Sequence, residues 1–261
     1  MSNMNDDDFV RRHNKRIRGI KRRKMIRRTG SLIVIIAVTA VICMYKLPYF
    51  NVSQIKIEGN EILSAEEIAA KTGIKGGENL FRLNMRSIAS DVKDIPYVDS
   101  VSVKRTVFPN VAVLVSIKES RMTACIKVDD GYVGIDRDAK VLETVDSVPE
   151  GVTEFHGINL TSFLPGEKAV CEDENILNSI AVICDGIEKF EYKDKISPVL
   201  IEDIGNISFY YDNRLNVICG SIIDFERKMD MLEEVIRSDD IKDNSRGTLD
   251  LRTQGKIIYT P

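Results

Sequence analysis

The longest apolar run in the chain lies near its amino terminus and predicts a membrane-spanning helix. No side chain is charged from residue 29 to residue 45, where the sequence reads TGSLIVIIAVTAVICMY. At about 1.5 Å per helical residue, this run reaches roughly 26 Å. Arg28 and Lys46 extend the span by snorkelling, toward the roughly 30 Å of a hydrocarbon core. We therefore predict a single transmembrane helix over residues 29–47.

In residues 50–120 the spacing of the apolar residues changes several times between the pattern of a strand and that of a helix. Ile55 and Ile57 alternate with polar neighbours, as in a half-buried strand. Two helix starts follow, with Ser64 and Asn84 as the capping side chains. Alternating valines around a Phe-Pro-Asn turn then predict a hairpin. The expected order is strand, helix, helix, strand, strand.

Residues 121–261 predict a β-rich region with two helices. An Asp-Gly turn at Asp130 indicates a hairpin. Apolar residues at intervals of three and four predict helices over about 176–190 and 224–237. The stretch 148–167 contains prolines and several glycines and reads as a looser connection. Further strands are expected at 199–202, 207–211, 215–219 and about 247–259.

Charge predicts which way the helix crosses the membrane. Residues 1–28 contain 11 basic and three acidic side chains and carry +8, although the whole chain carries −3. Short basic segments stay in the cytoplasm, so this tail is expected inside and everything after the helix outside. A nucleic-acid-binding arm is the alternative, but attraction to anionic lipid suits a segment beside a membrane helix better.

A cleaved signal peptide is the rival interpretation of the apolar run. Signal peptides have apolar cores of roughly 7–15 residues followed by a small-x-small cleavage site. The run here is longer, and residues 41–46 (VICMYK) offer no such site. We therefore expect an anchor that is retained.

Candidate catalytic and metal-binding chemistry is sparse. The two histidines, His13 and His156, belong to none of the common hydrolase motifs. The four cysteines after the helix lack metal-ligand spacing, and their apolar neighbours indicate buried free thiols. Clustered aspartates at 129–138 suit turns better than a calcium loop. We expect no catalytic residue, no cofactor and no metal, although paired-carboxylate or Ser/Lys sites depend only on spatial proximity.

A family resemblance rests on short phrases that recur in a fixed order behind a basic tail and a single anchor. The chain resembles the bacterial division proteins FtsQ and DivIB, in which a POTRA domain follows a membrane helix. The resemblance implies an α+β fold with a single N-terminal transmembrane helix, a POTRA domain (β-α-α-β-β) over 50–120 and a β domain over 121–261. The phrases are FNVSQI at 50–55, EGN at 58–60, GENLF at 77–81, IPYV at 95–98, VKR at 103–105 and FP at 108–109.

The resemblance also implies a function without an active site. It implies a non-catalytic scaffold at the division septum, linking FtsL-type and FtsB/DivIC-type membrane proteins to the septal transpeptidase and glycosyltransferase. In that family a late strand of the β domain offers its edge to the FtsB-type partner. The positions implied for partner binding are Thr248, Leu249, Asp250, Leu251, Arg252, Ile257, Ile258 and Tyr259.

Three alternatives stay open at the level of sequence. The POTRA unit is either a docking domain that accepts a strand at its edge or a spacer that holds the next domain off the membrane. The whole chain could instead be an export or assembly docking factor, or a membrane-anchored cell-wall hydrolase. A pocket with convergent titratable residues would favour the hydrolase, whereas a solid core with an open sheet edge would favour the scaffold.

Strand addition at the terminal strands leads to a first prediction. Proline at Leu249 or Leu251 should weaken partner binding much more than alanine does, because proline removes a backbone donor. Equal losses with proline and alanine, in pulldown of variants that stay folded, would count against strand addition.

Overall fold

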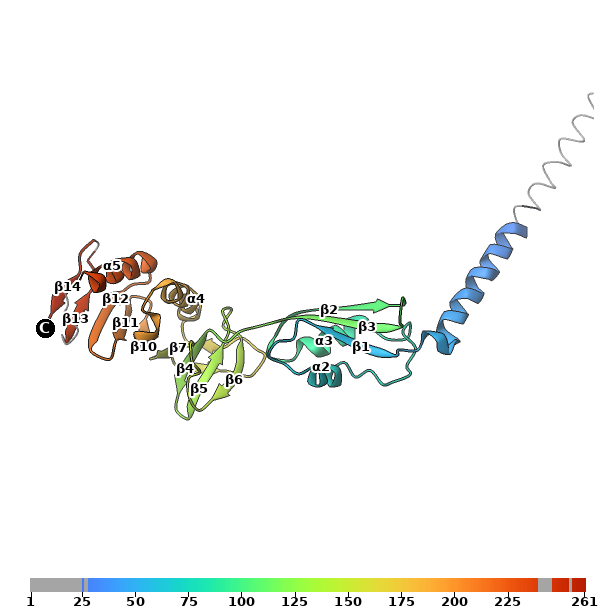
Figure 1. Cartoon of the computed structure of the whole chain (residues 1–261), viewed down its shortest axis with the longest axis horizontal. Helices are drawn as coiled ribbons and strands as arrows, with labels where there is room; N and C mark the ends of the chain where they lie inside the picture. The colour runs from blue at the N-terminus through green and yellow to red at the C-terminus, as the bar shows by residue number, and fades with distance from the viewer. Residues whose placement is uncertain (1–24, 26–27, 239–245, 254) are drawn as a thin grey trace, which may run out of the picture. The chain divides into compact units, whose positions relative to one another are not determined.

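The computed structural model describes Met25 and residues 28–238, 246–253 and 255–261 (Figure 1). Most of the predicted basic tail lies outside these residues. An exposed helix, Arg28–Lys46, occupies the predicted anchor and is long and apolar enough to cross a membrane. Among the described residues it is the one helix with these properties.

The predicted order of strand, helix, helix, strand and strand is confirmed after this helix. The second helix start also agrees in detail, because the Asn84 side chain accepts from the Arg86 amide at 3.1 Å. Ser64 likewise caps the first helix by accepting from the Glu67 amide at 3.1 Å. The strands pair in the order β1-β3-β2. The elements are η1 (Pro48–Phe50), β1 (Gln54–Glu58), α2 (Ala65–Lys71), α3 (Met85–Lys93), β2 (Val98–Thr106) and β3 (Ala112–Glu119).

The chain packs as two compact units, and the division between them runs through β1, α3, β2 and β3. The first unit contains the described residues of Met1–Lys56 together with Gly73–Ile88 and Val103–Val115. The second unit contains Ile57–Thr72, Ala89–Ser102 and the described residues of Ser116–Pro261.

A nine-stranded sheet forms the larger part of the second unit. Its strand order is β14-β13-β12-β11-β10-β7-β4-β5-β6. A separate pair, β8 (Leu160–Ser162) and β9 (Val170–Cys171), lies outside it. The nine strands are β4 (Ala124–Val128), β5 (Gly131–Ile135), β6 (Val141–Val145), β7 (Thr153–His156), β10 (Ile196–Asp203), β11 (Asn206–Tyr211), β12 (Leu215–Gly220), β13 (Gly247–Asp250) and β14 (Ile258–Thr260).

The stretch 148–167 is more ordered than its prolines and glycines suggest. It contains β7, which runs parallel to both β4 and β10. Phe155 of β7 is fully buried and pairs with Ile126 on one side and Val199 on the other. The expectation of a loose connection is therefore wrong at the point where the two halves of the sheet meet.

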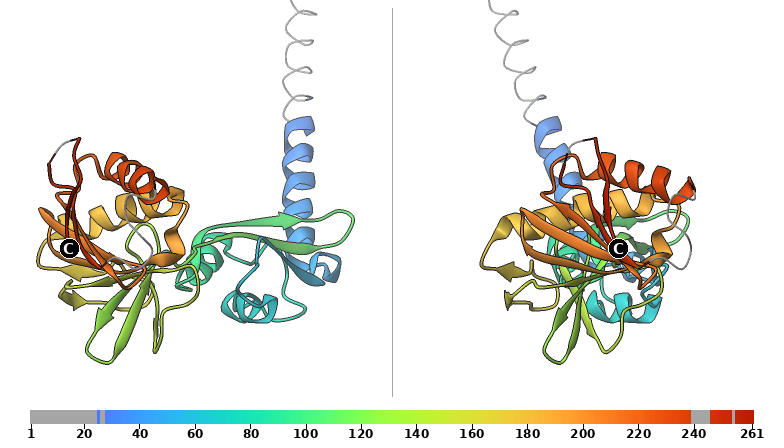
Figure 2. Two further views of the ribbon diagram at one scale, coloured as in Figure 1. Left: turned by 60° about the vertical axis from the view of Figure 1, so that its left-hand side comes forward. Right: turned by 90° about the vertical axis from the view of Figure 1, so that its left-hand side faces the viewer.

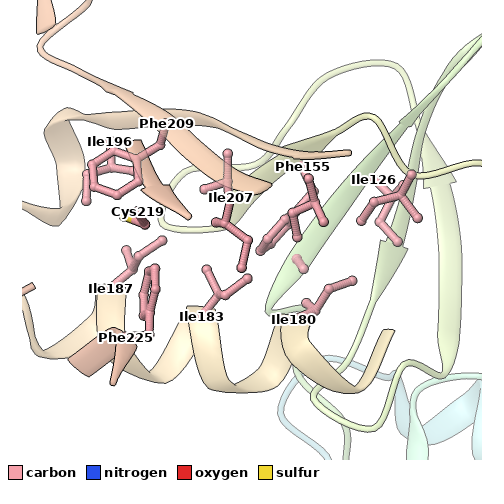
Figure 3. Packing of buried hydrophobic residues seen from close by; sticks show 14 of the residues in the cluster. Ile126, Phe155, Ile180, Ile183, Ile187, Ile196, Ile207, Phe209, Cys219 and Phe225 are labelled. Carbon is pink, nitrogen blue, oxygen red and sulfur yellow. The ribbon is translucent and has the colours of Figure 1, made fainter. Parts of the chain in front are cut away.

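Two amphipathic helices, α4 (Glu174–Lys189) and α5 (Phe225–Arg237), lie side by side on one face of this sheet (Figures 1 and 2). Asp173 caps α4 by accepting from the Asn175 amide at 2.9 Å. The predicted apolar stripe faces the sheet, and Figure 3 shows Ile180 and Ile183 pointing toward Phe155 and Ile207. Ile187 lies farther along the helix, near Cys219. One hydrophobic core therefore joins both helices to the sheet.

The structure accounts for the aspartates and cysteines in terms of folding. The Asp136 carboxylate accepts hydrogen bonds from the backbone amides of Asp138 and Lys140. These bonds stabilise the turn that begins at Asp136. All five cysteines are free thiols, and Cys125, Cys171 and Cys219 are buried. Burial raises the pKa of Cys219 to about 12 and that of Cys125 to about 11. These two thiols stay protonated and unreactive at neutral pH.

The contact between α4 and α5 leads to a stability prediction. A Cβ at Gly186 would lie 2.8 Å from Cδ1 of the buried Phe225 ring. Gly186→Ala should therefore destabilise the chain by about 1–3 kcal/mol through overpacking, although alanine is the better helix former. Urea unfolding of the detergent-solubilised protein measures this change. Asn178→Ala, at an exposed position of α4, is the control, and a stabilising Gly186→Ala would contradict the packing.

Candidate partner-binding edge of the sheet

The predicted partner-binding residues all lie at one end of the nine-stranded sheet. Thr248, Leu249 and Asp250 belong to β13, and Ile258 and Tyr259 belong to β14. Leu251 and Arg252 directly follow β13, and Ile257 directly precedes β14. Figure 1 shows the two strands next to each other at the end of the sheet.

The two strands differ in what they offer to a partner. β13 is paired on both sides, parallel to β12 and antiparallel to β14. β14 ends the sheet, and no other strand of the described chain pairs with its outer side. Only β14 therefore presents unpaired backbone groups at this end. The sequence alone did not separate these roles.

The two leucines of the predicted set serve the fold. Leu249 is fully buried and Leu251 is 2% exposed, and both belong to the core beneath the helices. The Leu251 amide donates to the Ile218 carbonyl of β12 at 2.9 Å. Proline at Leu251 would therefore remove a bond within the sheet, so it cannot separate loss of binding from loss of folding.

Strand register identifies the backbone groups at the open edge. Since the amides of Gly247 and Leu251 donate toward β12, those of Thr248 and Asp250, two residues apart, face β14. Their partners in β14 are Thr260 and Ile258. The N–H and C=O of the intervening Tyr259 therefore point away from β13, toward solvent.

Ile257 directly precedes β14, and its partly buried side chain packs against the core. The side chains of Ile258 and Tyr259 are 50% and 40% exposed, so apolar surface accompanies the open backbone. Thr260 also belongs to β14, although it was not among the predicted residues. Its β-branched side chain continues the strand pattern, which is the signal that could have identified it.

Asp250 and Arg252 form a closed pair at the end of β13. The Arg252 guanidinium donates to both carboxylate oxygens of Asp250, with Nη2 to Oδ2 at 2.6 Å and Nε to Oδ1 at 3.0 Å. These bonds hold the pKa of the Asp250 carboxyl below its ordinary value. The aliphatic stem of Arg252 also lies against Gly220, where a Cβ would come within 2.8 Å. The pair therefore shapes the turn after β13.

The opposite edge of the sheet is partly occupied. The Val141 amide of β6 donates to the Glu167 carbonyl, and the Gly166 amide donates to the Val141 carbonyl. A following bridge pairs Lys140 with Lys168. The loop after β8 thus bonds to the start of β6, whereas β14 has no such cover among the described residues.

A cluster of polar side chains around Glu154 bears on the question of catalysis. Tyr132 and Ser197 donate to its carboxylate, each at 2.9 Å, and Nε2 of His156 lies 2.7 Å from Oε1. Partial burial raises the pKa of Glu154, but these bonds outweigh burial and leave the pKa below its ordinary value. Because Ser197 bonds to the carboxylate rather than to His156, the cluster lacks the hydroxyl–imidazole contact that activates a serine.

A neighbouring hollow is lined by charged side chains, among them Arg137 and Asp185, which pair with each other. Its thiol, Cys184, has a pKa raised to about 12 by burial, so it is a poor nucleophile at neutral pH. Within the hollow Arg137 and Asp185 are thus paired, and the Glu154 carboxylate is held by its own hydrogen bonds.

Comparison with known proteins agrees with the architecture. Residues 50–120 match the model of the FtsQ-type POTRA domain. The cell division protein DivIB of Clostridium acetobutylicum is 27% identical over 229 residues, which cover 86% of this chain and 88% of that protein. DivIB of Clostridium botulinum is 26% identical over 92% of this chain and 93% of that protein. The cell division protein FtsQ of Corynebacterium glutamicum is 27% identical over 59% of this chain and 71% of that protein.

Among solved structures, the extracytoplasmic domain of DivIB from Geobacillus stearothermophilus aligns with 48% of this chain and 99% of that chain. The sequence identity is 12% and the TM-score is 0.30, a value too low to support a shared fold by itself.

Because some side chains at this edge are buried and others are exposed, truncating them should have unequal effects on stability. Leu249→Ala should destabilise the protein by about 2–5 kcal/mol, because it empties a fully buried site. Ile258→Ala should stay within about 0.5 kcal/mol of the parent chain, because its side chain is half exposed. The midpoint of urea unfolding measures both, and a large loss at Ile258 would show that β14 supports the core.

Proposed function

We propose that the chain is a member of the FtsQ/DivIB family of bacterial cell division proteins, to which it is similar over most of its length, and that it is a non-catalytic scaffold of the divisome. Its role in division rests on protein–protein contacts. The finer proposal is that it binds FtsB/DivIC-type and FtsL-type single-pass proteins and connects them to septal peptidoglycan synthesis.

The observation that carries this proposal is the open outer edge of β14. An extended segment of another protein can add to such an edge with main-chain hydrogen bonds, while side-chain contacts give selectivity. The N–H and C=O of Tyr259 supply the first bonds, and the exposed side chains of Ile258 and Tyr259 supply apolar contact. The other predicted residues hold this edge in place: Leu249 and Leu251 from the core, and Asp250 with Arg252 at the turn.

The proposed membrane topology follows from charge and from the apolar helix. Helix Arg28–Lys46 crosses the cytoplasmic membrane once, with the basic tail inside and all later residues outside. The POTRA domain spans 50–120 and the β domain 121–261, with the docking strand at the end of the chain. The protein gathers at the division septum through its partners.

Tyr259 allows a sharper test than the leucines do. Proline is tolerated in an edge strand where its missing N–H would face solvent, so Tyr259→Pro keeps the pairing of β14 with β13. We expect Tyr259→Pro to weaken capture of an FtsB/DivIC-type protein by roughly twofold to tenfold relative to Tyr259→Ala, since one hydrogen bond contributes about 0.5–1.5 kcal/mol. Quantitative co-purification of the detergent-solubilised full-length proteins measures this ratio.

Unfolding midpoints of both variants provide the control for folding. If proline and alanine reduced capture equally at matched stability, strand addition at β14 would be wrong. Capture that neither variant changes would place the partner on another surface.

A further inference from the structure

The turn between β2 and β3 exposes apolar side chains without an evident role in folding. Phe108 is 88% exposed and Val107 is 40% exposed. An aromatic side chain this exposed gains no free energy of burial on folding, so its apolar surface is available to another surface. The strands on either side pair with each other in the sheet, so their pairing fixes the position of the turn.

The turn lies at the end of its sheet where the chain arrives from the apolar helix. Val111, which follows the turn, accepts hydrogen bonds from the Ser53 amide at 3.0 Å and from its hydroxyl at 2.8 Å. Ser53 is only seven residues beyond Lys46, the last residue of the helix. Figure 2 shows the turn at the end of the sheet where β1 begins.

The end of the helix and the segment that joins it to the sheet carry side chains typical of a membrane interface. Tyr49 is 72% exposed and Tyr45 is 44% exposed. Tyrosine rings concentrate at the level of lipid headgroups because they are apolar with one polar end. The Tyr45 ring lies 6.4 Å from that of Phe81, and the Asn79 side chain donates to the Met44 carbonyl at 3.0 Å. The end of the helix and the loop of Phe81 thus form one surface.

Charge separates this surface from the rest of the protein. From Lys46, the last residue of the helix, onward, the residues of the first unit carry seven basic side chains and one acidic side chain, Glu78, a net charge of +6. All the other residues beyond the helix together carry −17. Lys46 and Arg82 line one hollow at the end of the helix. The basic residues are Lys46, Lys56, Lys75, Arg82, Arg86, Lys104 and Arg105.

We propose that the β2–β3 turn and these cations form a second membrane contact, which rests on the bilayer that the helix crosses. Phe108 and Val107 insert among the headgroups and upper acyl chains, and the cations face anionic phospholipid. Each contact is weak, but the seven-residue link to the helix makes the contact intramolecular and raises its effective concentration. The contact depends on the helix being membrane-spanning and does not depend on the role in division.

The absence of tryptophan from the sequence allows a direct test. Phe108→Trp gives the full-length sequence one tryptophan, located at the turn, whose emission is excited separately from that of the tyrosines. In vesicles of phosphatidylglycerol and phosphatidylethanolamine we expect its emission to shift to the blue. Lipids brominated near the top of the acyl chain should reduce its intensity roughly by half. The matched control is Ile62→Trp, because Ile62 is 54% exposed and its amide bonds to Glu119 at the last residue of β3.

Two outcomes decide the proposal. Emission from Phe108→Trp that is as red and as weakly quenched as that from Ile62→Trp would overturn the membrane contact. Strong quenching at Phe108 alone would support it.

A second pair of variants tests the charge. On the Phe108→Trp background, replacing Lys104 and Arg82 with serine should lower quenching in anionic vesicles. Replacing Lys71 and Lys93, exposed lysines of the second unit, should leave quenching unchanged. Equal effects of the two pairs, or equal quenching in neutral phosphatidylcholine vesicles, would overturn the role assigned to anionic lipid.

Discussion

The parallel pairing of β7 with both β4 and β10 joins the nine-stranded sheet into one body. On one side of β7 lies the meander β4–β5–β6, and on the other side lie the strands that end with β14. Phe155 is buried at the junction, between Ile126 and Val199. The stripe of α4 packs across the same core (Figure 3), so helix and sheet fix each other. This pairing determines which strand comes last and therefore where an open edge exists.

Local patterns in the sequence predicted the parts of the fold that depend on neighbouring residues. The apolar run, the caps at Ser64 and Asn84 and the stripe of α4 act within a few positions, and the structure agrees with each. The family resemblance is confirmed as well. In contrast, β7 is only four residues long and finds its partners far away along the chain. Nothing in a short segment between prolines and glycines indicates two distant partners, so it reads as a loop.

At the candidate site, too, local sequence patterns do not reveal which distant strands pair. The residues that the sequence suggested for partner binding lie together at one end of the sheet. Alternation predicts a strand, but it cannot predict that β13 crosses back to pair in parallel with β12 after α5. The residues predicted to bind a partner therefore have different structural roles. Leu249 and Leu251 are core residues, whereas Tyr259 carries the exposed backbone groups. The pairing of Asp250 with Arg252 is local and follows from their spacing.

The protein carries two surfaces of unlike chemistry, a basic and apolar turn that we propose contacts lipid and a strand edge that we propose binds protein. The central claim is that a partner extends the sheet at β14. Amide hydrogen exchange of Tyr259 tests this claim most directly. We expect fast exchange in the free protein and strong protection when an FtsB/DivIC-type protein is bound, while the amides of Ile258 and Thr260, which face β13, are protected in both states. A Tyr259 amide that exchanges equally fast in the bound complex would contradict it.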